Sequence, residues 1–182
     1  MNTIRIWVPG EPMPQQRTRR SRYGKDYNDP RCDAWQANVK SFAGKAIMTL
    51  PDRPAVWRPL DGALWMCCVF YLTRPKTKRY KDGTPKLNRY PWPDTKPDLK
   101  NLVWGVEDAL EGVVYTTDSR IVNWLNWRLF FEQRTIINNP IVLATCKVFA
   151  DACEPGVMIE VGEMPLSSQG CRSYGAAITY LN

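Results

Sequence analysis

The sequence contains no histidine, and this absence removes several kinds of catalytic chemistry. Ser-His-Asp and Cys-His nucleophilic catalysis both need an imidazole base, so neither is available. The six cysteines show no Cys-x-x-Cys spacing, which, together with the missing histidine, removes most zinc-site patterns and favours reduced thiols. A hydrolytic reaction in this chain would have to use carboxylates, lysine and a metal ion.

Long apolar segments are also missing. No apolar run approaches the roughly 18 to 20 residues that cross a bilayer, so we expect no membrane partner. Residues 1–8 alternate like a strand and end at Pro9-Gly10 without the apolar stretch of a signal peptide, which predicts a cytoplasmic protein. A length of 182 residues suits one domain, which we place at 1–162, followed by a C-terminal extension at 163–182.

Positive charge is concentrated in two segments, 17–31 and 74–100, with local net charges of +4 and +6 against +7 for the whole chain. Both segments also contain tyrosine, and the second contains tryptophan, so phosphate contacts can be joined by stacking on exposed bases. A solvated basic loop has the same composition, so charge alone leaves nucleic-acid binding open. The candidate DNA-binding residues are Arg17, Arg19, Arg20, Arg22, Lys25, Arg74, Lys76, Lys78, Arg79 and Lys81.

Hydrophobic periodicity predicts the first half of the fold. Residues 4–8 alternate as a strand does, and 17–30 is typical of a loop. Apolar residues from Trp35 to Ile47 recur at helical spacing, so we expect a helix that is N-capped by Asp33 and ends near Thr49. The continuous apolar run 63–72 predicts a central strand.

The second half begins with a proline-rich, basic connection at 73–95. A helix is expected from Leu99 to Leu110, with Asp98 as its N-cap and Gly112 just beyond its end. Further strands are expected at 121–131, 141–149 and 157–161, and 167–175 is typical of a flexible tail. This order of elements predicts an α+β single domain with a small mixed β-sheet packed against two main helices.

Acidic residues flank the second helix. Asp98 stands at its start and Asp118 follows in the turn after its end, an arrangement that we expect to bring two carboxylates to one metal ion, as in nucleases. Each aspartate also has a structural interpretation, Asp98 as an N-cap only and Asp118 as a turn residue before a strand.

The motifs around these residues resemble the RusA family of Holliday junction resolvases, in the same order over residues 4–161. The matching motifs are Val8-Pro9-Gly10-Glu11-Pro12, Lys96-Pro97-Asp98-Leu99-x-Asn101-Leu102, Glu107-Asp108-Ala109-Leu110-x-Gly112, Tyr115-x-x-Asp118-Ser119-x-Ile121 and Glu154-Pro155-Gly156-Val157. The resemblance implies a homodimeric, Mg²⁺-dependent endonuclease of a phage or bacterium, with Mn²⁺ as a substitute metal. Its substrate would be branched DNA such as the Holliday junction, cut during recombination, repair or phage DNA processing.

By position, Asp98 and Asp118 fall on two of the family's catalytic aspartates. The chain departs from the family at Lys100, where a further aspartate is usual, and at Trp104, where a lysine is frequent. An ammonium group cannot bind Mg²⁺ and repels it electrostatically. An active metal site would therefore need its third carboxylate from another residue.

Three interpretations follow. In the first, Glu107 or Asp108 supplies the third carboxylate, with Glu107 as the metal ligand, and Lys100 lies near the scissile phosphate. In the second, the protein binds branched DNA without cutting it. In the third, the site was deliberately inactivated, although the accompanying Trp104 favours natural divergence. The structural alternatives are a solvated Glu107 and a buried Asp108 bonded to Asn101. A protein-binding module that uses the eight tryptophans is a separate class, which predicts no preference for branched DNA.

Overall fold

The computed structural model describes residues 3–16, 19–20, 26–27, 29–86, 92–130 and 154–164. Within these residues the main sheet has four strands in the order β1-β6-β4-β5. They are β1 (Thr3–Pro9), β6 (Gly156–Glu163), β4 (Leu64–Leu72) and β5 (Ile121–Phe130). β6 runs antiparallel to both of its neighbours, whereas β4 and β5 are parallel, so the sheet is mixed, as predicted.

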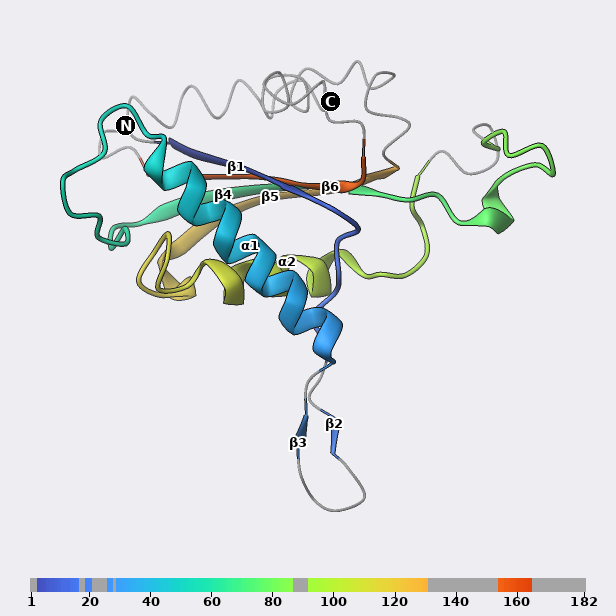
Figure 1. The fold of residues 1–182 in the computed structure, drawn as a ribbon, viewed down its shortest axis with the longest axis horizontal. Helices are drawn as coiled ribbons and strands as arrows, with labels where there is room; N and C mark the ends of the chain where they lie inside the picture. The colour runs from blue at the N-terminus through green and yellow to red at the C-terminus, as the bar shows by residue number, and fades with distance from the viewer. Residues whose placement is uncertain are drawn as a thin grey trace.

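Two helices, α1 (Pro30–Met48) and α2 (Leu99–Leu110), cover one face of this sheet, and α1 crosses in front of α2 in Figure 1. They bury a common core with β1, β4 and β6, to which α1 contributes Trp35, Val39 and Ala43. The predicted α+β architecture is confirmed. The predicted strand 141–149 and tail 167–175 lie outside the described residues.

The start of α1 corrects the predicted N-cap. Asp29, not Asp33, caps the helix, because its carboxylate accepts a hydrogen bond of 3.0 Å from the backbone N–H of Arg31. Pro30 at the first helical position has no N–H to leave unpaired. The buried stripe accordingly begins at Cys32, before the first residue of the predicted stripe.

The segment predicted as a loop before α1 contains a short hairpin instead. β2 (Arg19–Arg20) pairs antiparallel with β3 (Asp26–Tyr27), and Figure 1 shows both lying away from the main sheet, beyond the start of α1. β2 and β3 therefore lie apart from the core.

The two predicted elements nearest the metal-site motifs are confirmed. β4 is the central strand expected from its apolar run, and α2 begins and ends at the predicted residues. Gly112 follows α2 with a φ of +72°, a conformation that favours glycine. Cys32, Cys67 and Cys68 are buried and form no disulfide within the described residues. Neither helix in the described part of the chain is both long and apolar enough to span a membrane.

Candidate active site

The N-terminal end of α2 carries Asp98. This residue occupies the N-cap position, but its side chain makes no capping hydrogen bond. It is exposed and lines a pocket of about 420 Å³ together with Glu11, Lys96 and Asn101. A second carboxylate, that of Glu11, thus shares the pocket with Asp98, and the polar Asn101 side chain follows one turn into the helix.

Hydrogen bonds from three directions fix this pocket. The Glu11 carboxylate accepts from the backbone N–H of Thr73 at 3.2 Å, which ties the segment after β1 to the end of β4. The backbone N–H of Gln15 donates to the carbonyl of Asn101 at 2.8 Å. From β5, the Arg128 guanidinium donates to the carbonyl of Thr95 at 3.0 Å. The backbone on either side of Asp98 is therefore held in place, by Gln15 on one side and by Arg128 on the other.

The C-terminal end of α2 carries a second acidic group, centred on Glu107. Its side chain is only 4% exposed, and its Oε1 atom is buried without a hydrogen-bond partner among the described residues. Burial, followed by the nearby charges of Asp118 and Asp108, raises the pKa of Glu107 from 4.5 to about 7. The interpretation of Glu107 as a solvated helix residue is therefore wrong.

Asp108 is exposed next to Glu107, so a buried Asp108 bonded to Asn101 is not what the structure contains. Its side chain is hydrogen bonded to Gln36 of α1. Partial desolvation and the charge of Asp118 raise the pKa of Asp108, while Gln36 and Lys40 oppose that increase. Three carboxylates, those of Glu107, Asp108 and Asp118, thus interact electrostatically at this end of the helix.

The loop that presents Asp118 is fastened to the body of the domain. The buried Tyr115 hydroxyl donates to the backbone carbonyl of Glu107 at 3.0 Å. Burial first, and then the charge of Glu107, raises the pKa of Tyr115, so that this hydroxyl keeps its proton. Asp61 accepts a 2.6 Å hydrogen bond from the Thr116 hydroxyl and forms a 2.9 Å ion pair with Arg120. Asp118 therefore stands between two anchored residues.

The two acidic groups lie at opposite ends of α2. Residues 98 and 108 are ten positions apart, which corresponds to about 15 Å at about 1.5 Å rise per residue. β5 returns along α2 in the opposite direction (Figure 1). Asp98 is the N-cap of α2, whereas the charge of Asp118 acts on Glu107 and Asp108 near the end of the helix. The chain therefore brings Asp118 to Glu107 and Asp108, at the opposite end of α2 from Asp98. Within the described residues no three His, Cys, Asp or Glu side chains are grouped closely enough to hold a metal ion.

Lys100 and Trp104, the two departures from the family pattern, lie on the exposed side of α2 between these groups. The Lys100 ammonium is 4.5 Å from the centre of the Trp104 ring, which is a cation–π contact. The ammonium therefore stacks on the helix's own tryptophan in this structure.

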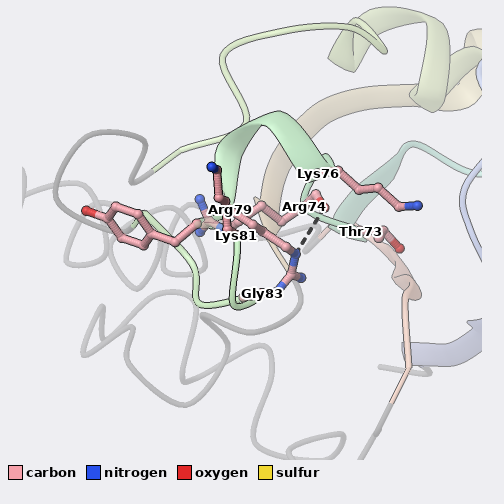
Figure 2. Close-up of a pocket in the computed structure, with 7 residues that line it drawn as sticks. Thr73, Arg74, Lys76, Arg79, Lys81 and Gly83 are labelled. Carbon is pink, nitrogen blue, oxygen red and sulfur yellow. Dashed lines mark hydrogen bonds between the residues drawn. The ribbon is translucent and has the colours of Figure 1, made fainter.

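The basic candidates around Arg74 divide into exposed and buried residues. Lys76 and Lys81 are exposed at a cavity of about 610 Å³ after β4 (Figure 2). Arg74 is buried, and Lys78 is buried in an ion pair with Asp94. These two side chains are thus packed within the domain.

Arg79 shapes this cavity. Its guanidinium donates to the carbonyls of Gly83, at 3.1 Å, and Arg74, at 3.5 Å, the second of which is the dashed line in Figure 2. The Lys86 ammonium lies 5.5 Å from the centre of the exposed Tyr80 ring. The other basic segment is described only at the backbone of Arg19 and Arg20, while Arg17, Arg22 and Lys25 lie outside the described residues.

Sequence reasoning assigned no role to two residues at the site, Glu11 and Gln36. Glu11 belongs to the first motif of the family resemblance, and its place next to Pro12 indicated that it lies in a turn. Neither signal indicated that Glu11 shares a pocket with Asp98. Gln36 gave no signal, because a glutamine on a helix surface is ordinary.

Fold and site together define the class: a mixed α+β domain with carboxylates at both ends of one helix and a basic surface beside them. The chain belongs to the RusA family, since a family model described as endodeoxyribonuclease RusA matches residues 9–161. Members of this family are endonucleases that resolve Holliday junctions. The chain is also 35% identical to the uncharacterized protein YqaN of Bacillus subtilis (strain 168) over 140 residues, which cover 73% of this chain and 92% of YqaN.

Proposed function

We propose that this protein is a Mg²⁺-dependent endonuclease that cuts branched DNA such as the Holliday junction. It would act in recombination, repair or phage DNA processing in the cytoplasm of a bacterium or an infected host. The observation that supports cleavage best is the buried Oε1 of Glu107, which has no hydrogen-bond partner among the described residues and lies near Asp118 within a chain of the RusA family. A buried carboxylate without a partner is costly unless a cation or proton occupies it.

The donor atoms suit the proposed metal. Carboxylate oxygens are the ligands that Mg²⁺ prefers, and Asp98, Asp118 and Glu107 are the proposed ligands. Because α2 separates Asp98 from the other two carboxylates within one chain, the proposed protein is a homodimer whose metal sites would combine carboxylates of both copies. When bound, Mg²⁺ orients a water molecule and neutralises charge at the phosphodiester. Mn²⁺, which takes the same oxygen ligands, is the expected substitute.

The remaining residues have separate proposed roles. Asp108 accepts a proton or positions water beside Glu107, because its own carboxylate is exposed and its pKa is raised by burial and by Asp118. Lys100, a flexible cation on the same helix, neutralises the scissile phosphate after leaving the face of Trp104. Lys76 and Lys81 hold the DNA backbone, together with Arg17, Arg19, Arg20, Arg22 and Lys25. This surface would then be supported from inside the domain by Arg74, Lys78 and Arg79.

The alternative is a protein that binds branched DNA without cutting it. Lys100 favours this alternative, because it replaces an expected ligand with a cation. Binding and cutting proteins share the same basic and aromatic surface, so DNA affinity does not separate them.

Cleavage of a labelled four-way junction with Mg²⁺, Mn²⁺ or EDTA tests the proposal. Metal-dependent nicking by the unaltered protein, lost in Asp98→Asn and Asp118→Asn but kept in the exposed control Asp52→Asn, is the expected result. Tight junction binding with no cutting in either metal would establish the binding alternative, especially if Lys100→Asp restored cleavage. Affinity is expected to fall steeply between about 50 and 200 mM salt, because the contacts are to phosphates.

A further inference from the structure

The cavity after β4 has a charged lining of one sign. Among the described residues, two arginines and two lysines line it and no carboxylate does: Arg74, Lys76, Arg79 and Lys81 (Figure 2). The acidic side chain that follows them in the sequence, that of Asp82, accepts a hydrogen bond of 2.9 Å from the backbone N–H of Thr84 inside the next turn. The cavity therefore suits an anion.

Two of these cations repel each other. The Arg74 side chain is only 1% exposed, and the half-buried Arg79 guanidinium reaches back to the carbonyl of the same residue. Burial first, and then the positive charge of Arg79, lowers the pKa of Arg74. A phosphate in the cavity would accept hydrogen bonds from guanidinium groups and offset this repulsion. The structure thus holds positive charge in an arrangement that a bound phosphate would stabilise.

Tyr80, which also lines this cavity, is held by a hairpin at residues 78–86. The backbone N–H of Lys86 donates to the carbonyl of Lys78 at 3.1 Å. Further along, the backbone N–H of Tyr80 donates to the carbonyl of Thr84 at 2.8 Å. The Tyr80 ring is 58% exposed, and Figure 1 shows the segment after β4 projecting in green beyond the sheet. A large ligand such as DNA can therefore reach the ring.

The size of the cavity and its aromatic ring favour a nucleotide over a phosphate alone. Its volume of about 610 Å³ is the share of roughly twenty molecules in liquid water, of which one phosphate fills a small part. Aromatic side chains stack on the faces of bases, and in a duplex those faces are covered by the neighbouring base pairs. Tyr80 can therefore stack only on a base that has left the duplex.

The cavity adjoins the pocket of Asp98 through one hydrogen bond. Thr73 lines the cavity, and its backbone N–H donates to the Glu11 carboxylate at 3.2 Å. Glu11 in turn lines the pocket that contains Asp98. A nucleotide in the cavity would therefore lie close, along the same DNA strand, to a phosphate at Asp98.

We propose that the cavity after β4 binds one unpaired nucleotide at the branch point of the DNA, with its base on Tyr80 and its phosphate among the arginines and lysines. The inference rests on the proposed function and names its substrate more closely, as branched DNA with an unpaired nucleotide at the branch. Because the cavity adjoins the pocket of Asp98, the bound nucleotide would also fix where the strand is cut.

Binding measured in EDTA, at one fixed salt concentration, tests the nucleotide site without cleavage. The probes are two four-way junctions that differ by a single unpaired thymidine at the branch. The unaltered protein should bind the junction with the unpaired thymidine about tenfold more tightly. Tyr80→Phe, which keeps the ring, should retain this preference, and Tyr80→Ala should lose it. Equal affinity of the unaltered protein for both junctions, or a preference that survives Tyr80→Ala, would overturn the proposal.

A charge variant separates the nucleotide site from a simple grip on the DNA backbone. Lys81→Gln should weaken binding of the junction with the unpaired thymidine more than binding of the paired junction. Lys45→Gln, which removes an exposed lysine near the end of α1, is the matched control and should bind both junctions as the unaltered protein does. Equal weakening of both junctions by Lys81→Gln would reduce the cavity to a backbone contact and refute the nucleotide site.

Photochemical cross-linking identifies the contact itself. The unpaired thymidine is replaced by 5-iododeoxyuridine, which links to a stacked aromatic ring on irradiation, and the linked peptide is identified by mass spectrometry. The link should fall on Tyr80 and should be absent when the same nucleotide is paired. Free dTMP at the concentration of the junction should leave the link intact. Its loss would assign the cavity to free nucleotides, and a link elsewhere in the chain would also contradict the proposal.

These results separate the two proposals. A tenfold preference and a link at Tyr80, in a protein that cuts DNA with neither Mg²⁺ nor Mn²⁺, would refute the nuclease function and retain the nucleotide site. Metal-dependent cutting with neither the preference nor the link would refute the nucleotide site and retain the nuclease. Where both hold, moving the unpaired nucleotide along its strand should move the nick by the same number of nucleotides, and a nick that stays in place would contradict its role in fixing the cut.

Discussion

Replacing Glu107 with glutamine should remove a pH-dependent loss of stability. In the folded protein the pKa of this carboxyl is raised from 4.5 to about 7, chiefly by burial. Because the unfolded chain releases the proton at lower pH than the folded chain, the free energy of unfolding falls as pH rises from about 4.5 through about 7. One pKa unit corresponds to about 1.4 kcal/mol, so the loss approaches an upper limit of about 3 kcal/mol above pH 7.

Urea unfolding followed by tryptophan fluorescence between about pH 4.5 and 8.5 measures this loss. EDTA keeps metal ions away from the protein. The protein concentration is fixed, so that any association between copies of the chain does not vary between samples. Near pH 4.5 wild type and Glu107→Gln should have similar stability, and above pH 7 the variant should be the more stable by about 1 to 3 kcal/mol. Glu154→Gln, which changes an exposed carboxylate, should follow the wild type. Parallel pH profiles for wild type and Glu107→Gln would refute the reasoning.

Three further predictions, each with its own substitution, test the structure. Asp29→Ala should lower the free energy of unfolding by about 1 kcal/mol through loss of the N-cap, and Asp33→Ala by less, as measured in urea; equal losses would contradict the assigned cap. Gly156→Ala should lower the melting temperature, because a Cβ there would lie 2.6 Å from the backbone of β1, whereas Gly44→Ala has open space and should raise it slightly. Tyr115→Phe should cost about 1 kcal/mol in urea by removing its buried hydrogen bond.

The elements near the site were predictable because local signals at both ends agreed. Asp98 after Pro97 and Gly112 after the last apolar turn gave the bounds of α2, and the apolar run of β4 gave the central strand. The start of α1 was predicted one turn late, because the pattern was read from Trp35. The cap depended instead on the carboxylate of Asp29, whose hydrogen bond is visible only in the structure.

The arrangement of the carboxylates was less predictable. Helical spacing predicted that Lys100 and Glu107 lie two turns apart along α2. The burial of Glu107 depends instead on the loop after α2, whose Tyr115 hydroxyl donates to the backbone carbonyl of Glu107. The separation of Asp98 from Asp118 depends on β5 returning along the helix, which is a property of the sheet topology. Asp98 and Asp118 both flank α2 in the sequence, but the length of the helix separates them in space.

Lys100 and Trp104 are better understood as one change than as two. The family usually has an acidic residue at the first position and a lysine at the second, one turn apart. Here the lysine occupies the first position, and its ammonium rests 4.5 Å from the ring centre at the second. Residues four apart on a helix are neighbours, so an aromatic at 104 supplies a face for a cation at 100. The positive charge has moved one turn toward Asp98, while the buried oxygen that has no partner in the described part of the chain lies at the other end of α2, on Glu107.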